Sequence, residues 1–262
     1  MRRSLLLLVL PLPLLATGCD TVSGVNIFSL QDDKDLGAQL ADEIASDPAT
    51  YPLLDEGQYP DAYDNLYRIR DELLATGEVD HAEDFDWELH IIDDDETLNA
   101  FCAPGGYIYV YSGLMRYLDT EDSFAGVMGH EMAHAAERHS TEQLTRIYGI
   151  TTLLGLIVGK DTGIAGEVAA SLLTLSFSRE DEAQADEDSV YYLCQTDYAA
   201  NGTAEFFEKL LAEGGTDVPE FLSTHPSSES RVADINALAK ELGCDTTLNP
   251  DSDWQAVLGT LP

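Results

Sequence analysis

Hydrophobic positions recur along this chain with two different periods. In residues 35–46 and 61–76, Leu, Ile and Ala are spaced by polar residues as on one face of a helix, so both segments are predicted to be helices. The period then shortens to two, which predicts three strands: Trp87–Ile91, Asn99–Ala103 and Tyr107–Tyr111. From Asp119 almost to Cys244 the pattern is helical again. This segregation of strands and helices predicts an α+β domain.

The turn Pro104-Gly105-Gly106 separates the last two predicted strands. Further along, residues 147–177 are the most apolar part of the chain after its N-terminus. Gly159, Lys160, Asp161 and Gly163 divide this segment into two pieces, each too short to cross a membrane. We expect a buried helical hairpin. The alternative is a surface that dips into lipid or holds an unfolded substrate.

The N-terminus has the features of an export signal. Two Arg precede an apolar run from Leu5 to Leu15, and small residues follow just before Cys19. The run is too short to span a bilayer. The end of the run resembles a bacterial lipobox, although Ala16 stands where Leu is usual. Residues 1–18 are therefore predicted to be a lipoprotein signal peptide and 19–31 a tether lipidated at Cys19; ordinary secretion with a stray thiol is the alternative.

Three further cysteines remain in the mature chain, which permits one disulfide and one free thiol. An oxidising cell envelope allows such a bridge to form. Cys194 and Cys244 each lie near the end of a predicted helix, so we expect these two to pair and Cys102 to stay free.

Composition changes the picture in one respect, which is charge. The chain has 13 Lys+Arg against 49 Asp+Glu, a net charge of −36. Such a chain cannot assemble the basic surface that nucleic acids require, so a nucleic-acid partner is excluded. Acids spread over the whole chain repel one another unless salt screens them, which favours a salt-rich, halophilic setting over that of a merely soluble acidic protein.

The candidate chemistry centres on the pentapeptide His130-Glu131-Met132-Ala133-His134. The segment has a helix start, with Asp119 as the expected cap and two acidic residues in the first turn. On a helix the two imidazoles are only about 40° apart and can bind one Zn²⁺. Glu131 is rotated by about 100° and falls beside the metal, where it can take a proton from water.

A catalytic zinc needs a third protein ligand. His139 lies about 140° round a continuous helix from His134 and is predicted to face elsewhere. Downstream, Glu182 and Asp186 share one helical face, so one carboxylate can bind the metal and the other can orient a ligand imidazole. In so acidic a chain an i, i+4 acidic pair also arises without function, and spacing alone leaves both interpretations open.

Four blocks resemble one known family when they are taken together: NAFCAPGGYIYVYSGLM, HEMAH, SREDEAQAD and STHPSSESR. The chain is similar to the zinc metalloendopeptidases that include HtpX, the CAAX prenyl proteases and compact periplasmic lipoprotein peptidases. The resemblance covers roughly residues 32–244, which predicts a metallopeptidase domain at 32–245 and a C-terminal tail at 246–262. It implies a mostly helical, zincin-like domain with a small β-sheet whose edge strand flanks the zinc.

The resemblance also assigns roles to single residues. His130, His134 and Glu182 match the ligands of one Zn²⁺ per chain, Glu131 the general base, and Asp186 the carboxylate that supports a ligand histidine. Two further positions near the metal match as well. His225 matches a residue that covers the open site as a fourth ligand or assists the oxyanion, and Arg231 a basic residue that faces the same cleft.

The strand Tyr107–Tyr111 is expected to be an edge strand beside the zinc and to bind an extended peptide by backbone hydrogen bonds. This makes Gly106, Tyr107, Ile108 and Tyr109 the candidate substrate-binding residues. Gly105 and Gly106 would let a substrate backbone approach closely, but a plain hairpin turn explains them equally well. Docking through the main chain predicts broad preference and unfolded substrates.

Two functions of different classes remain. The first is a lipid-anchored zinc endopeptidase that faces the periplasm of a bacterial cell envelope and cleaves unfolded or misassembled proteins; inner and outer membrane are not distinguished. The second is a zinc-stabilised chaperone or assembly factor with little proteolysis. Replacing Glu131 by Gln separates them, because only proteolysis needs the general base.

Overall fold

The computed structural model describes residues 25–157, 165–213, 221–226, 229–249 and 254–262. The predicted signal peptide and Cys19 lie outside these residues. Within them, every helix is too short or too polar to span a bilayer. In chain order the elements are α1 (Leu30–Ser46), α2 (Pro60–Leu74), β1 (Glu88–Ile92), β2 (Ala100–Ala103), β3 (Tyr107–Tyr111), α3 (Ser112–Tyr117), α4 (Glu121–Ala136), α5 (His139–Tyr148), α6 (Ile150–Ile157), α7 (Ala165–Ser171), the 3₁₀ turn η2 (Leu172–Thr174), α8 (Arg179–Leu193), α9 (Gly202–Glu213), α10 (Phe221–Thr224), α11 (Glu229–Leu242) and α12 (Trp254–Leu258).

The three predicted strands form one mixed sheet in the order β1-β3-β2. β1 pairs with β3 in parallel, and β2 pairs with β3 antiparallel through the predicted turn. The α+β prediction is confirmed, but the prediction that Tyr107–Tyr111 is an edge strand is wrong. β3 is the central strand, because β1, which precedes the hairpin, adds to its other side. Leu53 bridges Ile92 on the outer side of β1, so among the described residues β2 presents the open edge.

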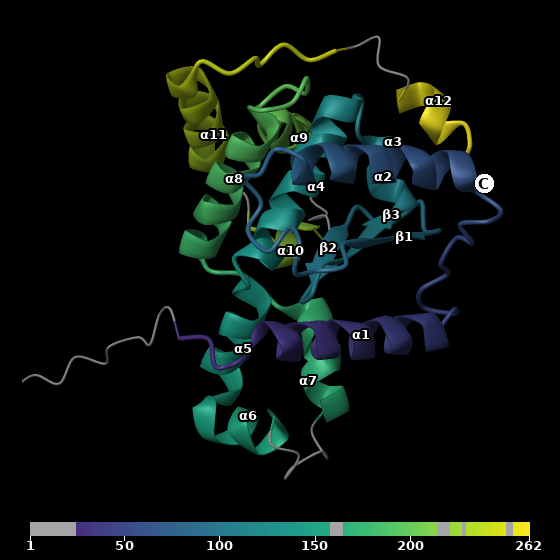
Figure 1. Cartoon of the computed structure of the whole chain (residues 1–262). Helices are drawn as coiled ribbons and strands as arrows, with labels where there is room; N and C mark the ends of the chain where they lie inside the picture. Colours follow the sequence, from purple (N-terminus) through teal and green to yellow (C-terminus); the bar gives the residue numbers. More distant parts are fainter. Residues whose placement is uncertain (1–24, 158–164, 214–220, 227–228, 250–253) are drawn as a thin grey trace, which may run out of the picture.

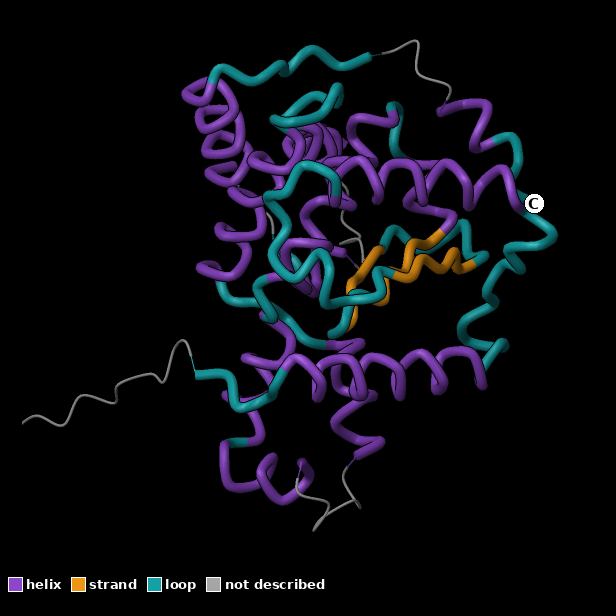
Figure 2. The backbone as a smooth tube through the Cα atoms, viewed as in Figure 1, coloured by secondary structure: helices purple, strands orange, loops and turns teal. Residues whose placement is uncertain are grey.

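The two faces of β3 pack against different layers (Figures 1 and 2). Ile108 and Val110 belong to the main core with α2 and α4. The three tyrosines of β3 pack against Leu40 and Ile44 of α1 instead. A Cβ on Gly105 (φ +79°) would lie 2.9 Å from the Cα of Lys34 in α1. The turn therefore needs glycine in order to pack against α1, and the structure favours the plain-turn explanation over close approach of a substrate.

Helix α4 is the centre of the fold, and all 16 of its residues are buried. It lies among the sheet, α8 and α9 (Figure 1). A Cβ on Gly126 would lie 2.2 Å from the backbone nitrogen of Thr203, so α4 and the start of α9 touch backbone to backbone. This close packing fixes the helix that carries the HExxH residues.

The start of α4 differs by one residue from the prediction. Thr120 is the N-cap, and its side chain accepts a hydrogen bond from the backbone N–H of Ser123. Asp119 lies just outside the helix and instead forms an ion pair with Lys209, at 2.8 Å between Oδ2 and Nζ. The two acidic residues expected in the first turn are present.

The folded domain is longer at both ends than residues 32–245. A capping box between Ser29 and Asp32 starts α1 at Leu30, inside the predicted tether, and Phe28 is buried. In the predicted C-terminal tail, Trp254 of α12 is fully buried and its indole N–H donates to the carbonyl of Leu118. The family resemblance does not reach these ends, and a single buried aromatic residue has no period that the hydrophobic pattern could show.

The expected disulfide is present in the structure. Cys194 ends α8 and Cys244 follows α11, with their Cα atoms 5.2 Å apart. Cys102 is a free, buried thiol on β2. The bridge links the C-terminal end of the ligand-bearing helix α8 to α11, which carries Arg231.

Helices α5, α6 and α7, here called the apolar lobe, extend beyond α1 on the side away from the sheet (Figure 1). Leu144, Leu153 and Val168 form its interior together with residues of α1 and the segment before it. The expectation of a buried hairpin is wrong for its outer face. Ile147 is 56% exposed, and Ile150 and Leu154 of α6 are 42% and 46% exposed. Residues 158–164 of the segment lie outside the described part of the chain.

Candidate metal centre

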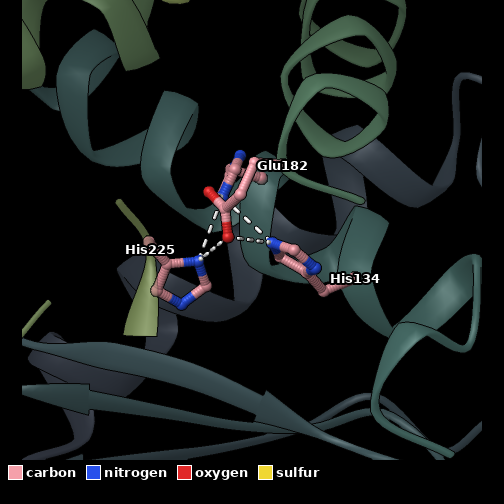
Figure 3. Close-up of side chains that lie close together, drawn as sticks. His134, Glu182 and His225 are labelled. Carbon is pink, nitrogen blue, oxygen red and sulfur yellow. Dashed lines mark hydrogen bonds and ion pairs between the residues drawn. The ribbon is translucent and has the colours of Figure 1, made fainter. Parts of the chain in front are cut away.

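Four buried side chains from three parts of the chain converge on one point. His130 and His134 lie one turn apart on α4, Glu182 lies in the first turn of α8, and His225 directly follows α10. One nitrogen or oxygen atom from each residue lies within 4.8 Å of the others. Figure 3 shows the Glu182 carboxylate between the rings of His134 and His225. The structure thus brings together the three predicted ligands and the predicted fourth residue.

The spacing of these atoms fits a zinc ion. His130 Nε2 lies 3.1 Å from His134 Nε2. Glu182 Oε2 lies 3.6 Å from His130 Nε2, and Oε1 lies 3.6 Å from His134 Nε2. His225 Nδ1 is 3.0 Å from Glu182 Oε1. Ligands bonded at about 2.0–2.1 Å to a tetrahedral Zn²⁺ lie about 3.3–3.4 Å apart. Imidazole nitrogens and a carboxylate are also the ligand types that zinc prefers.

The start of α8 is fixed by its own sequence. Ser178 caps the helix, and Asp181 completes a capping box with it. Glu182 therefore emerges in the first turn, where it faces α4. The helix dipole also stabilises a negatively charged side chain at this end of the helix.

Behind the ligand atoms, a carboxylate and a guanidinium hold the ligands in place. Asp186 Oδ1 is 3.1 Å from His130 Nδ1, which leaves His130 Nε2 directed at the metal centre. Nε and Nη2 of Arg231 each lie 2.6 Å from an oxygen of Asp186. Nη1 of Arg231 lies 2.5 Å from Glu182 Oε2. The buried guanidinium thus contacts both carboxylates.

These contacts decide the charge states of the site. Burial alone would raise the pKa of Asp186, but hydrogen bonds from Arg231 and His130 hold that pKa below its usual range. Burial likewise would lower the pKa of His130, yet its hydrogen bonds to Asp186 and Glu182 raise it to about 9. Without a metal, the charges of Glu182 and Asp186 are thus balanced by Arg231 and a protonated His130, and a metal ion that binds His130 has to displace that proton.

His134 is oriented by a chain of polar side chains that the sequence analysis missed. His134 Nδ1 lies 2.9 Å from His139 Nδ1, and His139 Nε2 lies 3.4 Å from Gln184 Oε1. The Gln184 amide donates in turn to Glu137. With Nε2 of His134 directed at the metal centre, its Nδ1–H donates to His139, so the ring of His139 sets the tautomer of His134.

The prediction that His139 faces elsewhere is wrong because the helix is not continuous. Helix α4 ends at Ala136, and Arg138 adopts the left-handed conformation with φ 61°. This break turns the start of α5 back towards His134. Arg138 is held there by an ion pair with the buried Asp33 of α1, at 2.5 Å. A left-handed residue other than Gly or Asn gives no local signal in a sequence.

Glu131 lies beside the four residues that could bind the metal, as its position on the helix predicts. Its Oε1 is 3.5 Å from His225 Nε2, and its carboxylate accepts a hydrogen bond from the backbone N–H of Cys102 on β2. Burial raises the pKa of Glu131, although the charges of His225 and His130 oppose this shift. A carboxylate with a raised pKa accepts a proton more readily.

Two phenylalanine rings cover the histidines, and neither was predicted. Phe177 stacks on His134 with ring centroids 4.0 Å apart, and Phe221 stacks on His225 at 4.4 Å. Both rings exclude water from the ligands and restrict their rotation. Single phenylalanines outside a periodic pattern give no signal of this role in the sequence.

The substrate-binding prediction changes with the sheet order. Tyr107, Ile108 and Tyr109 have strands on both sides and cannot accept another. The N–H of Tyr111 donates to the C=O of Asn99. Because hydrogen-bonded and non-hydrogen-bonded residues alternate along antiparallel strands, the backbone groups of Ala100 and Cys102 point away from β3. The fourth candidate, Gly106, is covered by its own chain, since a Cβ there would lie 3.0 Å from the nitrogen of Trp87.

A small cavity of about 20 Å³ lies at this edge of β2, lined among others by Phe101, Cys102, Glu131, His225, Leu173 and Leu175. It must widen to admit a peptide, and an extended peptide that then paired with β2 would lie next to the metal centre. The edge strand that flanks the site is thus β2.

Comparison with known proteins agrees with this geometry. Residues 62–239 match Peptidase family M48. The chain is 32% identical over 172 residues to the mitochondrial metalloendopeptidase OMA1 of Arabidopsis thaliana, covering 64% of this chain and 35% of that protein. It is 32% identical over 174 residues to the OMA1 of Schizosaccharomyces pombe, covering 64% and 50%. It is 31% identical over 181 residues to the beta-barrel assembly-enhancing protease of Escherichia coli, covering 63% and 37%.

The alignments thus span between about a third and a half of each relative's length. The family match covers more than half of this chain and includes every residue of the site described above. The chain therefore belongs to peptidase family M48.

Proposed function

We propose that this protein is a zinc metalloendopeptidase that hydrolyses peptide bonds of unfolded or misassembled proteins in the cell envelope. The observation that carries the proposal is the convergence of His130, His134 and Glu182, with Glu131 beside them. When bound there, Zn²⁺ supplies the Lewis acidity that polarises a peptide carbonyl and activates water at neutral pH. One zinc ion per chain satisfies this ligand set.

Glu131 acts as the general base and then as the general acid. It takes a proton from the attacking water and returns it to the leaving amine. The backbone N–H of Cys102 holds the carboxylate in place. Because Glu131 takes this N–H, a substrate strand would pair with the other outward-facing backbone groups of Ala100 and Cys102 and lie directly beside the base.

His225 has two roles in this proposal. Its Nδ1 lies 3.4 Å from His130 Nε2 within the cluster of ligand atoms, so His225 could serve as a fourth ligand at rest. Turned away from the cluster, the imidazole could instead donate a hydrogen bond to the oxyanion of a bound substrate. Arg231 and Asp186 keep Glu182 and His130 in orientation throughout. Arg231 is thus a positioning residue here.

The substrate class follows from the way a peptide can dock. Backbone hydrogen bonds to Ala100 and Cys102 need an extended chain and few particular side chains. Folded proteins do not offer such a segment, whereas unfolded or misassembled ones do. The E. coli relative is named for beta-barrel assembly, which supports a role in protein quality control.

The location is proposed from the sequence. The signal-like residues 1–18 and the lipobox-like context of Cys19 support a lipid anchor in a bacterial envelope membrane, with the domain facing the periplasm. The net charge of −36 supports a salt-rich, halophilic setting, because salt screens the mutual repulsion of the acids.

The Glu131→Gln variant tests the enzymatic proposal. Casein cleavage is expected to fall by at least about a hundredfold, because the general base is lost. Zinc content and melting temperature should stay close to wild type, since the amide has the same shape. Glu180→Gln, an exposed residue in the same turn of α8 as Glu182, is the matched control and should cleave normally.

Two results would contradict the proposal. Undiminished cleavage by Glu131→Gln would exclude this base. An unchanged cellular function in a cleavage-dead Glu131→Gln strain would favour the chaperone alternative.

A further inference from the structure

The outer face of the apolar lobe is unusual for this protein. Among the described residues, six large hydrophobic side chains are exposed, and three of them belong to this lobe: Ile147, Ile150 and Leu154. The other three, Val25, Leu211 and Leu242, lie outside α5, α6 and α7. Soluble domains rarely group such side chains without a binding partner.

The charge pattern singles out the same face. Ile150–Ile157 contains no Asp, Glu, Lys or Arg, although Asp and Glu make up 49 of the 262 residues. At the end of α5, Arg146 is already paired with Glu142 and Asp181. An apolar, uncharged helix at the end of a strongly acidic domain can enter a low-dielectric medium without desolvating a carboxylate.

The beginning of the described chain lies on this lobe as well. Asn26 Nδ2 donates to Thr141 Oγ1 of α5 at 2.8 Å, and Phe28 is buried in the lobe's interior. Figure 1 shows the segment before α1 beside α5. Only five residues lie between Cys19 and Val25, so the two are at most about 22 Å apart. A lipid on Cys19 would therefore hold the lobe within reach of the bilayer.

We propose that Ile147, Ile150 and Leu154 insert into the interfacial region of a lipid bilayer and orient the peptidase on the membrane. This inference rests on the lipid anchor of the proposed function. Helix α5 begins at His139, which contacts His134, and has 10 residues, so it places the metal centre about 15 Å from the patch. The enzyme then acts on unfolded segments that lie close to the membrane surface.

Fluorescence of the full chain tests the contact. Native Trp87 and Trp254 are 2% and 0% exposed and give a constant background. In Leu154→Trp bound to phosphatidylcholine vesicles, brominated lipid should quench the added emission, and that emission should shift to shorter wavelength. The matched control Leu211→Trp, 44% exposed on α9, should show neither change.

Three outcomes would overturn the proposal. The first is equal or absent quenching in both variants, and the second is failure of the protein to float with vesicles. The third is a concentration-dependent blue shift of Leu154→Trp without lipid, which would assign the patch to a second copy.

A second pair of variants, combined with Cys19→Ser, removes the anchor from the measurement. Ile150→Ser with Leu154→Ser should bind vesicles about tenfold more weakly, and Leu211→Ser with Leu242→Ser should bind as before. Because none of these signals requires proteolysis, they fail or succeed independently of casein cleavage.

Discussion

Helix α8 carries two groups of carboxylates whose environments differ. On the side of the metal centre, Glu182 and Asp186 face Arg231 and His130, and the pKa of each carboxyl is lowered despite burial. Further along, Asp188 faces other acids. Burial raises the pKa of Asp188 to about 7, and the charges of Glu137, Glu187 and Asp80 add to this shift.

Glu182 and Asp186 are here called the paired group, and Asp188 with the acids around it the unpaired group. The comparison shows what controls the charge of a buried acid. Burial opposes ionisation in both. A guanidinium and an imidazole reverse this effect in the first group, and nothing does so in the second, where Asp188 Oδ2 is buried without a hydrogen-bond partner among the described residues. The sequence around both is equally acidic, so the difference comes from the elements that pack against α8.

Removing the cation from the paired group should have the largest effect. Arg231→Leu leaves two buried carboxylates without their counter-charge, and the free energy of unfolding of the zinc-free protein should fall by about 3–5 kcal/mol. Zinc should recover part of this loss, because the ion supplies positive charge at the same place. Urea unfolding with and without zinc measures both values.

Two companion variants sharpen this test. Arg231→Lys keeps the charge and should retain part of the stability, although it cannot make the two-pronged contact with Asp186. The exposed Arg179 of the same region should tolerate replacement by Leu within about 0.5 kcal/mol. If Arg179→Leu and Arg231→Leu were equally mild, the paired group would not depend on its cation.

A series of hydrogen bonds runs from His134 through His139 and Gln184 to Glu137. It connects the metal centre with the unpaired group, because the charge of Glu137 acts on Asp188. His139→Phe removes the acceptor for His134 Nδ1–H and should weaken zinc binding by about 10–100-fold, as other changes behind metal ligands do. His139→Gln keeps an acceptor and should restore much of the affinity. Competition with a zinc chelator gives the constants.

This pair separates orientation from simple packing. Both variants replace the same ring, but only the glutamine can accept the hydrogen bond from His134. Equal zinc affinity in the two variants would mean that His139 acts only by filling space. Asp64, on the exposed side of α2, is a neutral control when changed to Asn.

The sequence predicted much of this site because its residues belong to regular helices. The spacing of His130 and His134, and of Glu182 and Asp186, is a local property of one helix each, and local periodicity survives in any tertiary context. The strands were found for the same reason. The contact between the two helices was indicated only by the family resemblance.

Features that depend on long-range packing were missed or wrong. The order β1-β3-β2 needs a strand from before the hairpin, so alternation within Tyr107–Tyr111 could not show that this strand is central. The inward turn of His139 depends on the left-handed Arg138, which an ion pair with Asp33 stabilises. The exposure of Ile150 and Leu154 contradicts the usual relation between apolarity and burial, and the sequence alone does not show which apolar helix will lack a cover.

The smallest expected effect concerns the unpaired group. An acid whose pKa is raised on folding binds its proton more tightly in the native state, so the contribution of Asp188 to stability is greatest at low pH and falls as pH rises from the unfolded pKa near 4 to about 7. Asp188→Asn removes this loss, and its melting temperature should exceed that of wild type at pH 8 but not at pH 4. Asp64→Asn, on the exposed side of α2, should change little at either pH. Molar salt should reduce the gain in melting temperature at pH 8, because it screens Asp188 from Glu137, Glu187 and Asp80. A gain that depended on neither pH nor salt would show that repulsion among these acids does not limit stability.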